Sequence, residues 1–218
     1  MIGVVIAMQS EADILLSDMK IERSLEISGK HVFVGEAYSK EIALCVCGVG
    51  KVNAALGTQL LISKFDVDKL FNFGVAGGLN ADTKLCEVYQ IGAAVQFDFD
   101  LTQLNGTKIG TLDEYSENYL QLSHFNAPFA VRQLGTSDRF NDSPVDFALL
   151  TQTLNADIRD MEGGAIVQAA HAAKLPVFSV KAISDVAGSG STTEQFLVNK
   201  SKALENLKTA LPIFFEEL

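Results

Sequence analysis

The sequence has no tryptophan, and its 218 residues include only three cysteines, three histidines and four prolines. Cys45, Cys47 and Cys86 are odd in number and lack metal-binding spacing. Cys45 and Cys47 would face the same side of a strand, and we expect buried, reduced thiols, which suit a cytoplasmic protein. The histidines share no metal spacing either. The sequence therefore predicts no metal site and no cofactor.

Positive charge is also scarce, because 17 Lys and Arg stand against 27 Asp and Glu, a net charge of −10. Such a chain and nucleic acid or anionic membranes would repel each other, which disfavours both as partners, and we expect neither. No apolar run is long enough to span a bilayer. The apolar residues 1–8 lack a basic leader and predict a first strand, not a signal peptide.

The length and the 48% hydrophobic content fit one α/β domain over residues 1–218. Predicted strands alternate with helices, which indicates a three-layer αβα sandwich around a mixed, mostly parallel sheet. The expected strands are residues 2–8, a hairpin of 31–37 and 41–47, then 70–73, 87–97, 129–134, 158–161 and 176–184. The expected helices are 9–19, 52–65 with Leu56 near its apolar face, 144–154, 162–174 and 194–217, the last interrupted or bent near Pro212.

Residues 70–79 are the stretch around which the chain is organised. An apolar run stops at Gly74, and Gly77 and Gly78 follow. The first half predicts a buried strand and the second a loop whose backbone passes close to a ligand, because glycine lacks a Cβ. A tight turn without a ligand fits this stretch equally well. No G-x-G-x-x-G follows the first strand, which argues against a nicotinamide oxidoreductase.

Polar residues follow three other strand ends, which a parallel arrangement would bring to the same edge as the glycines. Glu11 follows the first strand at Met8, Glu162 follows the strand at 158, and Ser184 and Asp185 end the strand at 176. This predicts a crevice with three carboxylates. Each also has a structural alternative: a first-turn acid favoured by the helix dipole for Glu11 and Glu162, and a turn cap for Asp185.

In this order and spacing, the motifs resemble the bacterial 5′-methylthioadenosine/S-adenosylhomocysteine nucleosidases of the nucleoside phosphorylase/nucleosidase family. The motifs are IAMQSE at 6–11, GVGKVNAA at 48–55, FGVAGG at 73–78, SDRF at 137–140, DMEG at 160–163 and AISDVA at 182–187. The resemblance implies a nucleoside phosphorylase-like fold and hydrolysis of a purine nucleoside to adenine and the thioribose. It also implies a cytoplasmic homodimer that serves methionine salvage.

The same resemblance implies the catalytic roles. Asp185 is the general acid at purine N7, oriented by Ser184, and Glu11 positions the attacking water. Glu162 accepts hydrogen bonds from the ribose hydroxyls beside Met161. The chemistry agrees, since a positioned acid accelerates departure of a poor leaving group by roughly 10²–10⁴-fold, and carboxylates favour a cationic sugar. An aspartic acid keeps its proton near neutrality only with burial or a like-charged neighbour.

Phe140 is expected to stack on the base, and the backbone of Asn141 to meet the base edge. The other expected substrate-binding residues are Met8, Val49, Gly74, Val75, Ala76 and Gly77.

Some positions depart from the family pattern. Val75 stands where relatives often have serine, and Lys181 where arginine is common. Thr193 falls in a shortened loop, where relatives carry a phenylalanine over the 5′ group. Leu101 and Leu104 match the segment that enters the neighbouring subunit's site. The base and ribose ends are therefore intact, while selectivity for the 5′ group is open.

A phosphorylase would need arginines for its phosphate. The four arginines, none at the first strand end or in the glycine segments, are Arg23, Arg132, Arg139 and Arg159. Glu11 would repel phosphate, so water is favoured as the nucleophile. The alternatives are a relative with another 5′ group, such as a futalosine-type hydrolase, a phosphorylase, and a nucleoside-binding protein that releases no base.

Overall fold

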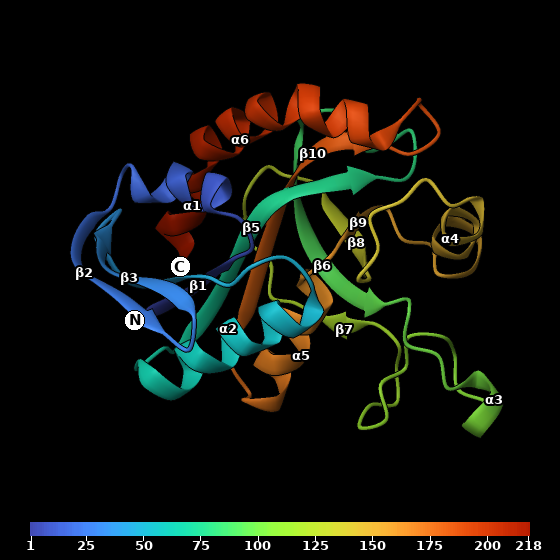
Figure 1. The fold of residues 1–218 in the computed structure, drawn as a ribbon, viewed down its shortest axis with the longest axis horizontal. Helices are drawn as coiled ribbons and strands as arrows, with labels where there is room; N and C mark the ends of the chain where they lie inside the picture. Colours follow the sequence, from blue (N-terminus) through green and yellow to red (C-terminus); the bar gives the residue numbers. More distant parts are fainter.

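The computed structural model describes residues 1–218 and alternates strands with helices (Figure 1). The strands are β1 (Ile2–Ile6), β2 (Lys20–Ile27), β3 (Lys30–Ala37), β4 (Lys40–Val46), β5 (Lys69–Gly78), β6 (Val88–Gln96), β7 (Leu120–Gln121), β8 (Val131–Thr136), β9 (Ile158–Asp160) and β10 (Val177–Val186). The helices are α1 (Gln9–Leu16), α2 (Lys51–Lys64), α3 (Thr102–Asn105), α4 (Pro144–Ala148) with a π-helical turn after it (Leu149–Thr153), α5 (Gly163–Ala172) and α6 (Thr192–Glu217).

The sheet is mixed, as predicted, and its strand order is β10-β6-β8-β9-β5-β1-β4-β3-β2. The central strands β4, β1, β5 and β10 pair in parallel. Because β10 also pairs with β5, the strands β10, β6, β8, β9 and β5 close into a ring. The predicted parallel arrangement is wrong for β9, which runs antiparallel to β5. The end of β9 still lies beside the ends of β5 and β10, because Arg159 pairs with Gly77, which in turn pairs with Asp185.

Helices cover both faces of the central strands, which confirms the three-layer prediction (Figure 1). On one side, α1 and α6 pack over the apolar cluster that contains Leu15, Phe71 and Phe214. On the other side, α2 and α5 pack over the cluster that contains Leu61 and Ile166. Apolar side chains on both faces explain why β1 is a continuous buried run.

Several local predictions need correction. Residues 20–27 form β2, a strand that the sequence analysis missed, because nearly all of its side chains are exposed. Leu56 does not face the core: 58% of it is exposed on the outer side of α2. Pro212 does not interrupt α6, which continues to Glu217, while the alternative of a bend near Pro212 stays a prediction.

The three cysteines are free thiols, as expected, and Cys45 and Cys47 are buried in the same apolar cluster while Cys86 is partly buried. Burial raises the pKa of Cys45 to about 11 and that of Cys47 to about 12. Both thiols are therefore un-ionised near neutral pH and behave as small apolar side chains.

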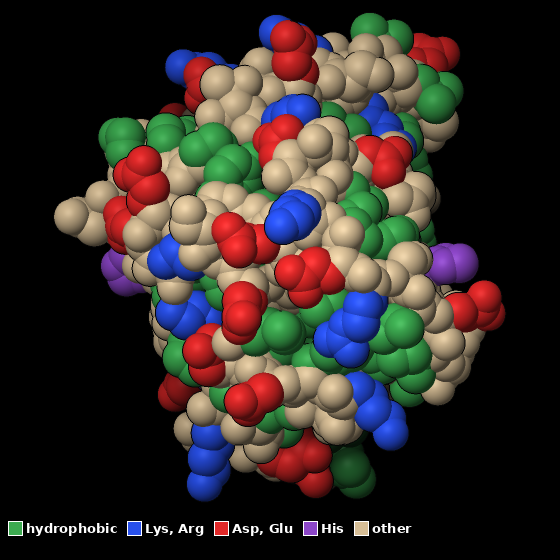
Figure 2. Space-filling view, turned by 90° about the vertical axis from the view of Figure 1, so that its left-hand side faces the viewer, with side chains coloured by type: hydrophobic (Ala, Val, Ile, Leu, Met, Phe, Trp, Pro, Cys, Tyr) green, Lys and Arg blue, Asp and Glu red, His purple; other side chains and the backbone are tan.

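The edge of the sheet at β2 carries charges of both signs. Lys20, Glu22, Arg23 and Glu26 are exposed along this strand, and acidic and basic side chains are interspersed over the face in Figure 2. Charged side chains discourage edge-to-edge pairing with another sheet. Among the helices, none combines the length and the apolar character needed to cross a membrane.

Candidate active site

A cavity of about 400 Å³ lies where β1, β5, β9 and β10 end. It is lined by all the predicted site residues except Gly74 and Asn141. The three predicted carboxyl groups, those of Glu11, Glu162 and Asp185, are each less than 9% exposed. The structure therefore brings these carboxyl groups together, although their catalytic roles stay predictions.

Glu11 lies in the first turn of α1, where its side chain turns back towards β5. Its Oε1 accepts a hydrogen bond from the Val75 amide at 2.8 Å, and its Oε2 accepts one from the Met8 amide at 3.1 Å. Burial raises the pKa of Glu11, while Lys181 and the two amides act in the opposite direction. Both carboxylate oxygens are thus fixed by backbone, which orients the carboxyl group in the cavity.

The predicted glycine loop is wrong, because β5 continues as a strand through Gly78. Gly74 and Gly77 are needed for the close approach of side chains, not for a turn. A Cβ on Gly74 would lie 2.5 Å from Glu11 Oε1, and one on Gly77 would lie 2.9 Å from Asp185 Oδ1. These glycines let two acidic side chains lie directly on the strand. Gly74 therefore belongs to the site without lining the cavity.

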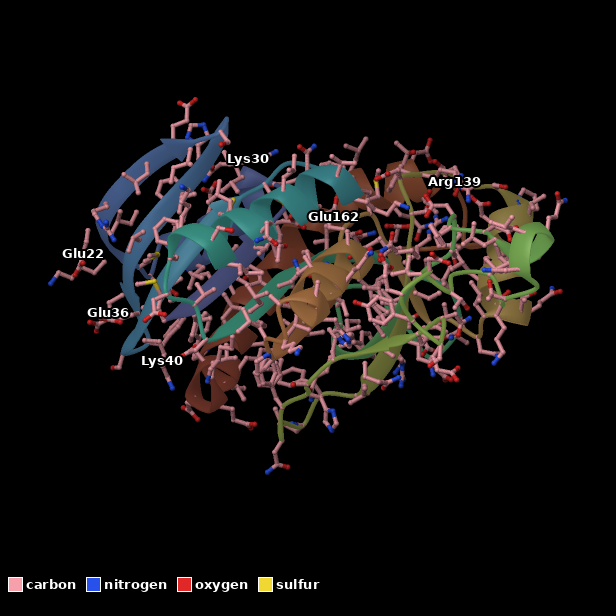
Figure 3. All side chains as sticks on the ribbon, turned by 90° about the horizontal axis from the view of Figure 1, so that it is seen from below. Glu22, Lys30, Glu36, Lys40, Arg139 and Glu162 are labelled. Carbon is pink, nitrogen blue, oxygen red and sulfur yellow. The ribbon has the colours of Figure 1, made fainter.

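Glu162 is the residue before α5, and its side chain lies inside the molecule, whereas Glu22 and Glu36 point outward (Figure 3). Its Oε1 accepts a hydrogen bond from the Gly50 amide at 2.8 Å. Burial, and next the charge of Asp160, raise its pKa to about 7. Glu162 therefore changes its protonation state near neutral pH.

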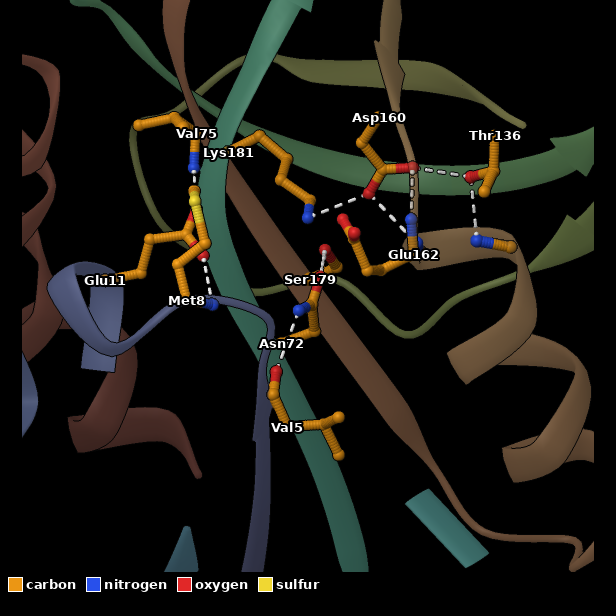
Figure 4. Close-up of polar contacts among 12 residues, drawn as sticks. Val5, Met8, Glu11, Asn72, Val75, Thr136, Asp160, Glu162, Ser179 and Lys181 are labelled. Carbon is orange, nitrogen blue, oxygen red and sulfur yellow. Dashed lines mark hydrogen bonds and ion pairs between the residues drawn. The ribbon is translucent and has the colours of Figure 1, made fainter. Parts of the chain in front are cut away.

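A buried ion pair of Lys181 with Asp160 lies beside Glu11 and Glu162 (Figure 4). Lys181 Nζ lies 2.9 Å from Asp160 Oδ2, and both side chains are at most 3% exposed. Asp160 also accepts hydrogen bonds from the Thr136 hydroxyl at 2.6 Å and the Gly163 amide at 2.9 Å. Burial lowers the pKa of Lys181, but Asp160 and Glu162 outweigh this and raise it. A fixed positive charge therefore lies among the acidic groups of the site.

Asp185 lies on β10, next to Gly77 of β5. Its Oδ2 accepts a hydrogen bond from the Ser184 hydroxyl at 2.9 Å, as the predicted orienting role requires. Its Oδ1 lies 3.8 Å from Arg159 Nη2. Burial raises the pKa of Asp185, and the Ser184 and Arg159 interactions reduce that rise. Asp185 is therefore a buried acid that keeps its proton to higher pH than a solvated aspartic acid.

Aromatic and aliphatic side chains form the outer part of the cavity. Phe140 is 50% exposed, and its ring lies edge-on to Phe196 of α6 at a centroid distance of 5.8 Å. Thr193 and Leu197 of the same helix also line the cavity. Asn141 follows Phe140 but does not line the cavity, because its carbonyl accepts a hydrogen bond from Arg159 Nη1 at 2.7 Å.

Across the chain, no group of three or more His, Cys, Asp or Glu side chains is arranged to hold a metal ion. Comparison with protein families decides the family, since the model described as the phosphorylase superfamily matches residues 1–216. The chain belongs to the phosphorylase superfamily. This match confirms the family resemblance seen in the motifs.

Relatives within the phosphorylase superfamily include nucleosidases with different substrates in their names. The chain is 28% identical over 209 residues to a 5′-methylthioadenosine/S-adenosylhomocysteine nucleosidase of Listeria monocytogenes, covering 88% of each chain. It is 26% identical over 217 residues to an aminodeoxyfutalosine nucleosidase of Campylobacter jejuni, covering 94% of this chain and 95% of the relative. Its fold matches futalosine hydrolase of Helicobacter pylori with a TM-score of 0.90, at 23% identity over 100% of this chain and 97% of that one.

Several lining residues of this phosphorylase superfamily site escaped the sequence analysis. Arg159, Phe196 and Leu197 line the cavity, and so does Arg139, which the sequence places beside Phe140. The argument that no arginine meets the glycine segment is wrong, because Arg159 pairs with Gly77 across β9 and β5. No sequence signal reveals this contact, since it depends on the antiparallel direction of β9. For α6, helical spacing from Thr193 predicts that Phe196 and Leu197 share its face.

Proposed function

We propose that this protein is a purine nucleosidase that hydrolyses the N-glycosidic bond of 5′-methylthioadenosine and S-adenosylhomocysteine. The observation that carries the proposal is the set of three buried carboxyl groups, Glu11, Glu162 and Asp185, around one cavity of nucleoside size. The names of relatives over most of the chain's length support the same reaction. This reaction would give the protein a part in methionine salvage.

Asp185 acts as the general acid in this proposal. As the C1′–N9 bond breaks, its electron pair passes to the base, and Asp185 gives its proton to N7. The raised pKa of Asp185 supports this step, because the group must hold a proton at the working pH. The Ser184 hydroxyl fixes the Asp185 carboxyl group at 2.9 Å.

Glu11 positions the water that adds to C1′ and takes the proton that this water loses. Two backbone amides fix its carboxylate, and Lys181 helps to keep it ionised despite burial. Glu162, beside Met161, accepts hydrogen bonds from the ribose hydroxyls. These carboxyl groups also favour the positive charge that develops on the sugar.

Water remains the favoured nucleophile, although two arginines line the cavity. Arg159 is bound to Asn141, and Arg139 forms an ion pair with Asp146 at 3.1 Å. Lys181 is likewise paired, with Asp160. No arginine contacts Glu11, where a phosphate would replace the water. If base release required phosphate, the protein would be a phosphorylase and not a hydrolase.

The apolar side chains of Phe196 and Leu197 suit a thioether at the 5′ position. This end of the cavity lies at the protein surface, since Leu197 is 72% exposed. This exposure, together with the Campylobacter jejuni relative, favours one second candidate, a futalosine-type hydrolase with a larger 5′ group.

The chain is proposed to act as a cytoplasmic homodimer, with Leu101 and Leu104 near the neighbouring site. Support comes from exposed apolar side chains: Leu104 is 79% exposed on α3, which projects from the body (Figure 1), and Val52 and Leu56 of α2 are 70% and 58% exposed. Light scattering after gel filtration measures the oligomeric state. The double variant Val52→Glu, Leu104→Glu places charges on these exposed apolar positions and is expected to yield monomers. The free thiols agree with a reducing cytoplasm.

The test of the function is release of adenine from 5′-methylthioadenosine in phosphate-free buffer, followed by chromatography. We expect release by the wild type and a loss of at least roughly 10²-fold in kcat for Asp185→Asn and Glu11→Gln. Asp13→Asn, on the exposed side of α1, is the matched control and should keep its rate. Full turnover in Asp185→Asn would contradict the acid assignment. Binding of nucleosides without any base release would make the chain a binding protein.

A further inference from the structure

Asp185 and Arg159 lie on either side of Gly77, on three neighbouring strands. Gly77 of β5 pairs with Asp185 of β10 and with Arg159 of β9. A Cβ on Gly77 would lie 2.9 Å from Asp185 Oδ1 and 3.1 Å from Arg159 Nε. Because glycine has no side chain, the two charged groups face each other over its backbone, on the wall of the cavity.

Arg159 is held in place through one of its two terminal nitrogens. Nη1 donates to the Asn141 carbonyl at 2.7 Å, while Nη2 is buried without a hydrogen-bond partner. Nη2 lies 3.8 Å from Asp185 Oδ1, which is also buried without a partner. A buried donor without an acceptor costs stability. The fixed guanidinium therefore offers an unused N–H beside the proposed general acid.

These two groups match one kind of purine edge. In a 6-oxopurine, N7 and O6 are adjacent acceptors, whereas a 6-aminopurine has an acceptor at N7 and a donor at N6. The proposed acid, Asp185, donates to N7. The next group along the wall is Arg159, which can only donate. Two adjacent donors fit the two acceptors N7 and O6. A 6-amino group would instead place its N–H donors against those of the guanidinium, and no hydrogen bond could form.

Arg159 also removes the acceptors that an amino group would use. The guanidinium lies between the Asn141 carbonyl, which it binds through Nη1, and Asp185 Oδ1, which faces Nη2. Because Arg159 Nη1 occupies the Asn141 carbonyl, the hydrogen-bonding group presented beside Asp185 is a donor instead of an acceptor.

We propose that Arg159 recognises an oxygen at position 6 of the base, so that the site prefers 6-oxopurine nucleosides to their 6-amino counterparts. This inference rests on the proposed nucleosidase activity and adds a preference at position 6 of the base, with 5′-methylthioadenosine as the slower substrate. The bond that breaks and the proton that moves are those given above. As the C1′–N9 electron pair passes to the base, and until the N7 proton is fully transferred, partial negative charge reaches O6, where the guanidinium stabilises it.

The test compares 5′-methylthioadenosine with 5′-methylthioinosine, its 6-oxo counterpart, in wild type, Arg159→Met and Arg139→Met. The readout is the ratio of kcat/KM for the 6-oxo to the 6-amino nucleoside. We expect a ratio above one in the wild type and a fall of roughly 10- to 100-fold in Arg159→Met, since a hydrogen bond to a charged group is lost. Arg139→Met removes the same charge from the same lining and should leave the ratio unchanged.

Two results would overturn the inference: faster cleavage of the 6-amino nucleoside by the wild type, or an unchanged ratio in Arg159→Met. Calorimetric binding of hypoxanthine and adenine to the wild type gives an independent readout, with hypoxanthine expected to bind more tightly. This measurement tests the inference even if neither nucleoside is cleaved or if Arg159→Met fails to fold. Failure to cleave either nucleoside would count against the proposed function, while a preference for adenine would count against the role of Arg159.

Discussion

Lys181 and Asp160 form an ion pair at 2.9 Å in which neither side chain is more than 3% exposed. Removal of one partner leaves an uncompensated buried charge. We expect Lys181→Met to lower the free energy of unfolding by about 3–5 kcal/mol, measured by urea denaturation. Lys208→Met, which breaks the solvent-accessible pair with Asp18, should cost less than about 1 kcal/mol. Equal stability of Lys181→Met and wild type would show that the pair is dispensable.

The carboxyl group of Glu162 should make stability depend on pH. Folding raises its pKa from 4.5 to about 7, so the folded protein binds this proton more tightly than the unfolded chain. The contribution of Glu162 to stability therefore falls as the pH rises from 4.5 to about 7, by on the order of 3 kcal/mol. We expect Glu162→Gln to flatten the pH dependence over this window in denaturation experiments. Parallel curves for the two proteins would contradict the raised pKa.

A methyl group on Gly74 should displace the carboxylate of Glu11. The added Cβ would lie 2.5 Å from Oε1, which the Val75 amide holds in place. We expect Gly74→Ala to lower kcat by roughly 10²-fold or more, comparable to the loss of a positioned base. Gly92→Ala is the matched control on β6, because its Cβ would crowd only the Val131 side chain. Similar losses in both variants would point to general disruption of the strands instead.

Arg159 should also set the upper pH limit of activity. Asp185 must be protonated to act, so activity falls as the pH rises through its pKa. The guanidinium reduces the rise of that pKa. Arg159→Met should therefore move the alkaline limb of the kcat profile to higher pH, with 5′-methylthioinosine as substrate. A limb that stays in place would mean that another group controls it.

The sequence was sufficient to predict the layers of the fold and most of the cavity lining. Apolar runs and helical spacing predicted the β3–β4 hairpin and the covering helices, and acids at strand ends identified Glu11, Glu162 and Asp185. These features could be predicted because each pattern lies within one short stretch of the sequence.

The contacts that the sequence could not predict depend on strand direction. Because β9 runs antiparallel to β5, Arg159 pairs with Gly77. The residues that flank Arg159 and Gly77 in the sequence contain no pattern that predicts this pairing. The continuation of β5 through Gly74 was missed because glycines favour loops, while here they make room for side chains from α1 and β10. Strand β2 was missed although Ile21, Leu25 and Ile27 alternate with polar residues, because its charged and largely exposed side chains weaken that pattern.

The closed ring of β10, β6, β8, β9 and β5 has a mechanical consequence for the site. Asp185, Gly77 and Arg159 sit on three consecutive members of that ring. A ring cannot lose one strand from an edge, so these positions share one cooperative unit of unfolding, unlike the β2 edge. The backbone positions of the acid and the arginine are therefore protected from the fraying expected of an edge strand.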